Sequence, residues 1–127
     1  MDHKLKLMVV DDSPLFRTWL IHSLSADDRF QVVGYAVNAL DAQEKIPLLQ
    51  PDMLTLDIEM PGMSGIDFLK QLLPVHPIPV ILVSSLNLRV FDALEAGAVD
   101  FVRKPDEANG LSKEIFLSML RSKLMVE

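Results

Sequence analysis

Short apolar runs alternate along the chain with longer stretches in which apolar residues recur at helical spacing. Within the runs, apolar residues seldom alternate with polar ones, which is typical of parallel strands that are buried on both faces of a sheet. The runs span residues 5–10, 32–36, 53–56, 80–83 and 99–102. This pattern predicts five parallel strands, each followed by a helix.

The stretches between the runs carry residues that begin and end helices. Ser13 and Pro14 form an N-cap and first-turn pair, and Gly97 is placed to end the fourth helix. Pro47 predicts that the second helix stops or kinks at that point, because proline lacks the N–H that a helix interior requires. The predicted helices lie near residues 14–24, 39–47, 66–73, 90–96 and 112–125.

Five such β–α units predict one α/β domain over residues 1–127. Right-handed crossovers turn the (βα)5 pattern into a doubly wound five-stranded parallel sheet with helices on both faces. We expect the flavodoxin-like strand order 2-1-3-4-5. In sheets of this kind, ligands bind beyond the carboxyl ends of the strands.

Polar side chains follow the predicted strands at their carboxyl ends. Asp11 and Asp12 follow the first strand and Asp57 follows the third, with Glu59 two residues later. The other polar residues at strand ends are Ser84 and Ser85 after the fourth strand and Lys104 after the fifth. We therefore expect all of these side chains to converge on one edge of the sheet.

The predicted cluster has the composition of a phosphoryl-transfer site. Three crowded carboxylates require a compensating cation, and Mg²⁺ is the usual ion where carboxylates and a phosphoryl group meet. The metal would let the Asp57 carboxylate attack phosphorus, while Lys104 and a serine hydroxyl would bind the phosphoryl oxygens. Alone, each residue is a common turn, cap or loop residue, so the interpretation rests on their joint occurrence.

Composition and charge exclude several other classes of protein. A net charge of −6 argues against non-specific binding to nucleic acid, because no basic stripe is available for the phosphates. The sequence has no apolar run of the roughly 20 residues that span a bilayer, and we expect no secretory peptide. The absence of cysteine excludes disulfides and cysteine ligands, and it fits the cytoplasmic location that we expect.

Four stretches of the sequence resemble the receiver domain of two-component response regulators. The resemblance covers essentially the whole chain, and its motifs are highly specific in combination. The matching stretches are Val9-Val10-Asp11-Asp12-Ser13, the run from Leu56 to Gly65, Val83-Ser84-Ser85, and the run from Gly97 to Pro105.

The resemblance implies a phosphoacceptor and a metal site. Asp57 would accept the phosphoryl group from a sensor histidine kinase. Asp12 and Asp57 would ligate Mg²⁺ directly, Asp11 would act through water, and the backbone carbonyl of Glu59 would supply a further ligand.

The resemblance also implies the parts of a conformational switch. Ser84 occupies the position of the switch hydroxyl, and Phe101 occupies that of an aromatic side chain that turns inward on activation. Lys104 would contact the phosphoryl group, and the bond between Lys104 and Pro105 is expected to be cis.

Within the family, the sequence most resembles the receiver of chemotaxis methylesterases. The stretches with this likeness are residues 53–61, 83–86 and 100–105. The methylesterase catalytic domain is not in the chain, so we expect either a fragment of a longer regulator or a free-standing receiver. Two departures are a shortened segment from Ser84 to Gly97 and the proline at position 47.

Two other functions are compatible with parts of the pattern. A Mg²⁺-dependent phosphohydrolase of the haloacid dehalogenase type also uses an aspartate nucleophile after a strand, with an acid two residues later, as Glu59 is here. Pro61 departs from the residue that such enzymes have at that position. A flavodoxin-like flavin binder shares the fold class, but Asp11 and Asp12 would repel its phosphate.

The last predicted helix has more apolar residues than one buried face requires. The excess predicts either a partner-binding face, formed with the fourth helix and fifth strand and able to support a phosphorylation-dependent homodimer, or a surface that awaits an output domain. The apolar residues are Ile115, Phe116, Leu117, Met119, Leu120, Leu124, Met125 and Val126.

Overall fold

A computed structural model describes residues 4–60, 62–85 and 89–126 of the chain. In that part of the chain, five strands alternate with five α-helices, and a short 3-10 turn, Glu107–Asn109, precedes the last helix. The strands are β1 (Leu5–Val10), β2 (Phe30–Ala36), β3 (Met53–Leu56), β4 (Val80–Ser84) and β5 (Asp100–Arg103). The helices are α1 (Pro14–Ser25), α2 (Ala39–Leu49), α3 (Gly65–Leu72), α4 (Arg89–Glu95) and α5 (Lys113–Val126).

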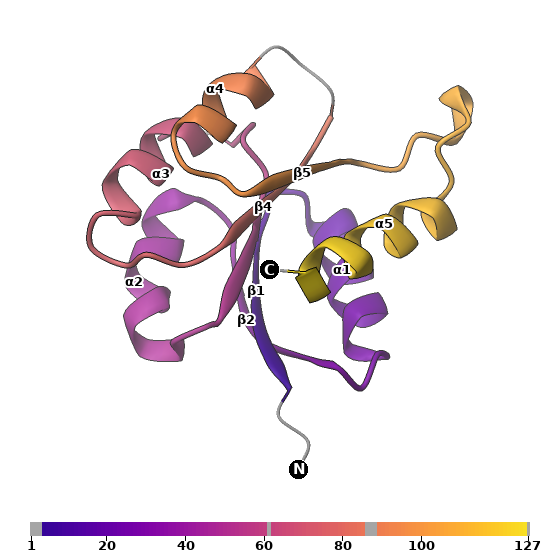
Figure 1. Cartoon of the computed structure of the whole chain (residues 1–127), viewed down its shortest axis with the longest axis horizontal. Helices are drawn as coiled ribbons and strands as arrows, with labels where there is room; N and C mark the ends of the chain where they lie inside the picture. Colours follow the sequence, from indigo (N-terminus) through magenta and orange to yellow (C-terminus); the bar gives the residue numbers. More distant parts are fainter. Residues whose placement is uncertain (1–3, 61, 86–88, 127) are drawn as a thin grey trace.

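The strands form one parallel sheet in the order β2-β1-β3-β4-β5, so the predicted fold and strand order are confirmed. Helices α2, α3 and α4 cover one face of the sheet, and α1 and α5 cover the other (Figure 1). The strands therefore lie between two helical layers, which explains why their sequences lack polar alternation.

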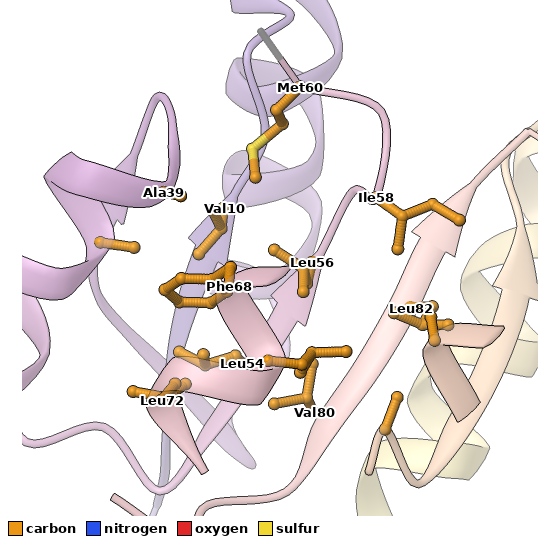
Figure 2. Close-up of a cluster of buried hydrophobic side chains, with 14 of the residues drawn as sticks. Val10, Ala39, Leu54, Leu56, Ile58, Met60, Phe68, Leu72, Val80 and Leu82 are labelled. Atoms are coloured by element: carbon orange, nitrogen blue, oxygen red, sulfur yellow. The ribbon is translucent and has the colours of Figure 1, made fainter. Parts of the chain in front are cut away.

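Two apolar layers hold the sheet to its helices. Successive β1 residues enter opposite layers: Met8 packs toward α2 and α3, while Leu7 and Val9 pack toward α1 and α5. In the first layer, the Phe68 ring of α3 lies close to Leu54 and Leu56 (Figure 2). Because both layers bury fully apolar side chains, the sheet edge that carries the polar residues is held on a rigid base.

Local signals in the sequence set most helix ends. The Ser13 hydroxyl accepts a hydrogen bond from the backbone N–H of Phe16, as expected of an N-cap. Gly97 has a φ of +122°, a left-handed conformation that favours glycine, and it ends α4 as predicted. Helix α2 does not stop at Pro47 but continues to Leu49, because the loss of one N–H in its last turn leaves the preceding hydrogen bonds intact.

Helix α5 sorts its apolar residues between the core and solvent. Phe116, Leu120 and Leu124 recur every four residues and are fully buried against the sheet. Leu120 is therefore a core residue and does not belong to an exposed partner face. Ile115 and Met119 lie on the outer side, with 49% and 44% of their surface exposed.

Some sequence expectations fall outside the described residues. Pro61 and Leu86 are among them, as are positions 86–88 of the shortened segment between Ser84 and Gly97. Among the described helices, none has both the length and the apolar character needed to cross a membrane.

Candidate phosphoacceptor site

The carboxyl ends of four adjacent strands position the polar cluster. Asp11 follows β1, Asp57 follows β3, Ser84 ends β4 and Lys104 follows β5. The backbone N–H of Asp57 still donates to the Val10 carbonyl at 3.0 Å, and that of Lys104 donates to the Ser84 carbonyl at 3.0 Å. These bonds extend the sheet by one residue, so the side chains start from backbone that cannot move freely.

Asp57 is the centre of the cluster, and both of its carboxylate oxygens have partners. The Ser84 hydroxyl donates to Oδ1 at 3.0 Å, and the backbone N–H of Glu59 donates to the same oxygen at 2.9 Å. The Lys104 ammonium donates to Oδ2 at 2.9 Å. Asp57 and Ser84 are both buried, so this carboxylate is oriented by fixed donors rather than by water.

Asp11 shares the same lysine. Its Oδ2 atom lies 2.9 Å from the Lys104 ammonium, and its Oδ1 atom accepts a hydrogen bond from the backbone N–H of Ser13 at 2.8 Å. Arg17 donates from Nη1 to the Asp11 carbonyl at 2.9 Å. Lys104 therefore acts as an internal counter-ion between two buried carboxylates.

Burial and charge shift the pKa values of this pair. Burial is the largest influence on Asp11 and raises its pKa above the ordinary 3.8, although the Ser13 N–H and Lys104 act in the opposite direction. Burial by itself would lower the pKa of Lys104. The hydrogen bonds and charges of Asp57 and Asp11 outweigh this effect, so the pKa of Lys104 lies above 10.5 and the lysine is charged at neutral pH.

Asp12 completes a group of carboxylates that could hold a metal ion. Asp11, Asp12 and Asp57 each offer an oxygen, and the three oxygens lie within 4.8 Å of one another. Asp12 is exposed, whereas the other two are buried, so the group opens to solvent on one side. Three oxygen donors of like charge suit a hard divalent cation such as Mg²⁺.

The remaining features of the predicted site are Phe101 and the bond after Lys104. Phe101 lies apart from the polar cluster, half-buried beside the core layer of α2, α3 and α4. The bond between Lys104 and Pro105 is trans, so the expectation of a cis bond is wrong. The trans form is the lower in energy by roughly 0.5–1 kcal/mol for a residue before proline, and Lys104 reaches both carboxylates with it.

Two residues next to the cluster, both on α1, were not expected there from the sequence. Arg17 holds the Asp11 carbonyl, and the Phe16 ring centroid lies 4.6 Å from the Lys104 ammonium. Arg17 lies six positions after Asp11, in the first turns of α1, and this spacing could have indicated its contact with Asp11. Nothing in the sequence pattern indicated that an aromatic ring would meet a lysine 88 positions away along the chain.

A family model agrees with this arrangement. The model of the response regulator receiver domain matches residues 7–116. The chain is also similar to the response regulator domain of CheB from Thermotoga maritima, a crystal structure with 37% identity and a TM-score of 0.81. That likeness covers 97% of this chain and 92% of the other.

Curated relatives are similar over nearly the whole chain. One is a protein-glutamate methylesterase/protein-glutamine glutaminase of Syntrophomonas wolfei, 46% identical over 97% of this chain and 36% of its own length. Another protein-glutamate methylesterase/protein-glutamine glutaminase, from Syntrophotalea carbinolica, is 50% identical over 87% of this chain and 33% of its own length. The chain thus spans about a third of the length of these relatives.

Proposed function

Because this chain belongs to the family of response regulator receiver domains, we propose that residues 1–127 form a switch that accepts a phosphoryl group on Asp57. The donor is a phosphohistidine of a sensor histidine kinase. The observation that carries the proposal is the position of the Asp57 carboxylate between a hydroxyl, an ammonium and two further carboxylates.

The proposed step exchanges one phosphorus bond for another. An Asp57 oxygen forms a P–O bond as the P–N bond to the histidine breaks, and the released imidazole takes up a proton. Oδ1 accepts two hydrogen bonds, whereas Oδ2 accepts one from Lys104, so Oδ2 keeps a lone pair with which it could attack phosphorus. Lys104 and Ser84 can then bond to the phosphoryl oxygens and stabilise the charge that develops there.

The carboxylate group fits Mg²⁺, which would neutralise charge between Asp57 and the incoming phosphoryl group. In the proposal, Asp12 and Asp57 would bind the ion directly, Asp11 would act through water, and the Glu59 carbonyl would supply another oxygen. The exposure of Asp12 supports this assignment, because an exchangeable ion needs access from solvent.

Phosphoramidate with Mg²⁺ should add one phosphoryl group to the protein, as measured by intact mass. Asp12→Ala should weaken Mg²⁺ binding at least about tenfold, because it removes a direct ligand. Asp28→Ala, which removes an exposed acid in the turn before β2, is the matched control and should leave Mg²⁺ binding unchanged. Unchanged Mg²⁺ affinity in Asp12→Ala would show that this carboxylate is not a ligand.

The output of the switch is a finer part of the proposal. The similarity to protein-glutamate methylesterases supports a chemotaxis receiver that controls a methylesterase output domain or a separate target protein. A cytoplasmic location follows from partnership with a histidine kinase and is proposed with it. The domain itself is proposed to bind neither nucleic acid nor membrane.

Phosphorylation is proposed to reshape the face made by α4, β5 and α5. The Ser84 hydroxyl moves from Asp57 to a phosphoryl oxygen, which makes room for Phe101 to turn inward. Phe91 on α4, Val99 before β5 and Met119 on α5 are exposed apolar residues around that face. Exposed apolar area of this kind supports a partner-binding surface, and a homodimer is the simplest partner.

Self-association is tested with beryllofluoride, a phosphoryl mimic, in sedimentation velocity. The chain should dimerise only with the mimic, and Met119→Glu should weaken the dimer about tenfold or more, because a carboxylate would be desolvated at the contact. Leu48→Glu changes an apolar residue on α2 that is more exposed than Met119 and should leave the dimer intact. A chain that remains monomeric with the mimic would exclude this mode of association.

A further inference from the structure

The Lys104 ammonium is enclosed on three sides by groups of different chemistry. Two sides are the Asp11 and Asp57 carboxylates, each with an oxygen at 2.9 Å. The third is the Phe16 ring, whose centroid lies 4.6 Å from the ammonium nitrogen. A cation at this distance from an aromatic ring is attracted by the negative charge of the ring face.

Other aromatic rings hold the Phe16 ring in this position. Phe16 meets Phe116 edge-on, with centroids 5.8 Å apart and an interplanar angle of 64°, and it lies 5.7 Å from the Trp19 ring. The centroids of Trp19 and Phe116 are 5.9 Å apart, so the three rings form a closed cluster between α1 and α5. Phe116 is fully buried, which anchors the cluster in the core.

We infer that Phe16 is a positioning residue for Lys104, and this inference rests on the proposed phosphoryl transfer to Asp57. The carboxylates around the ammonium change when Asp57 becomes an acyl phosphate and a divalent ion shares Asp11. The ring is neutral, so its attraction for the ammonium does not depend on the charge at Asp57 or Asp11. The ring therefore keeps the lysine at the edge of the sheet. From there the Lys104 ammonium can bind the Asp57 carboxylate before phosphorylation and the phosphoryl group after it.

If Phe16 had a purely structural role, the loss of another ring from the same core should have the same effect. The chain contains a matched control for this comparison. Phe30 belongs to the same apolar layer and also carries a cation on its ring, with the guanidinium carbon of Arg29 at 5.4 Å from the centroid. It lies at the start of β2, paired with Leu5, at the opposite end of the sheet from Lys104. Phe30→Leu thus removes a ring and a cation contact from the same core without touching the site.

The first measurement is made on the protein without Mg²⁺ or phosphodonor. Protons above a ring face resonate upfield, so the ε-methylene and ammonium protons of Lys104 should be shifted upfield in the NMR spectrum. The shift should disappear in Phe16→Leu and persist in Phe16→Tyr and Phe30→Leu. If the Lys104 protons had the same chemical shifts in Phe16→Leu as in the unmodified chain, the inference would be wrong.

The second measurement is the rate of phosphoryl uptake from phosphoramidate at saturating Mg²⁺. Phe16→Leu should slow uptake by about 3- to 30-fold, the range that a partly desolvated cation contact with a ring allows, and Phe16→Tyr should restore the rate. Phe30→Leu should retain the rate even if it lowers the midpoint of thermal unfolding. If Phe16→Leu and Phe30→Leu slowed uptake equally, in proportion to their loss of stability, Phe16 would contribute only to the core and would not position Lys104.

The two measurements separate this inference from the proposed function. If the unmodified chain takes up no phosphoryl group, the proposed function fails. The metal-free spectrum then still reports whether Phe16 holds the lysine. If uptake occurs but the Lys104 resonances show no ring-dependent shift, the inference about Phe16 fails while the proposed function stands.

Discussion

Asp57→Asn is expected to abolish phosphoryl uptake and to leave the fold intact. Asparagine has a neutral amide in place of the carboxylate, so it offers phosphorus no comparable nucleophile. Its amide also cannot satisfy the site: Ser84 and Glu59 donate to one Asp57 oxygen and Lys104 donates to the other. Whichever way the amide turns, its NH₂ group faces a donor. Intact mass after incubation with phosphoramidate and Mg²⁺ measures the loss.

The control for this variant is Asp67→Asn, which neutralises an exposed acid in the first turn of α3. It carries the same charge change without altering the cluster, and it should accept one phosphoryl group at the normal rate. The assignment of Asp57 would be wrong if the Asp57→Asn protein gained the same mass as the unmodified chain.

Lys104→Ala is expected to destabilise the metal-free protein and to slow phosphoryl transfer. Removal of the ammonium leaves the Asp11 and Asp57 carboxylates buried, close together and without a counter-charge. Breaking a buried ion pair in this way costs about 2–4 kcal/mol of folding free energy, somewhat below the usual range because the site opens to solvent. The loss of a donor for the phosphoryl oxygens should slow transfer by about 100-fold or more.

Mg²⁺ and pH give this prediction a specific signature in urea unfolding. Mg²⁺ should reduce the difference in unfolding free energy between the unmodified chain and Lys104→Ala. The ion replaces the missing positive charge, and its binding stabilises the native state. The raised pKa of Lys104 means that its contribution is fully present below its unfolded pKa of 10.5 and is lost as the pH rises through the folded pKa. The difference should therefore stay constant from pH 7 to about pH 9 and shrink only in strongly alkaline solution.

Lys123→Ala provides the comparison. Lys123 forms an ion pair of the same length with Asp100, 2.9 Å, but both side chains are about one-third exposed. Its removal should cost about 1 kcal/mol or less, and Mg²⁺ should not restore the loss. If Lys104→Ala and Lys123→Ala lost equal stability with no response to Mg²⁺, Lys104 would not be the counter-ion of the acidic group.

Most of the fold could be predicted because its signals are local. The strands are buried on both faces, so their apolar runs stand out, and β1 and β3 have the predicted bounds. Helix ends followed from caps such as Ser13 and from Gly97. The predicted stop at Pro47 was only two residues early. A proline near the end of a helix removes few hydrogen bonds, and α2 ends at Leu49, where Gln50 caps it with a left-handed φ of 48°.

The surface of α5 could not be assigned from sequence. Its apolar residues are too numerous to define a single face by their spacing alone. Leu120 and Met119 are neighbours in the chain, yet the docking of the helix on β5 buries the first completely and leaves the second exposed. Which face is buried depends on the rotation of the helix about its axis, and contacts distant in sequence set that rotation.

The identity of the site was already contained in the amino-acid order, whereas its internal pairing was not. Asp11, Asp57, Ser84 and Lys104 each follow or end a strand, and parallel strands bring their carboxyl ends to one edge in any such sheet. Strand neighbours are about 4.8 Å apart, so the reach of Lys104 from β5 to Asp11 beyond β1 depends on side-chain length and sheet twist. The packing of α1 on the sheet brings Phe16 close enough to cover the lysine. Strand order and residue type follow from short-range pattern, but contacts across several strands depend on distances that exist only once the sheet and both helical layers have packed.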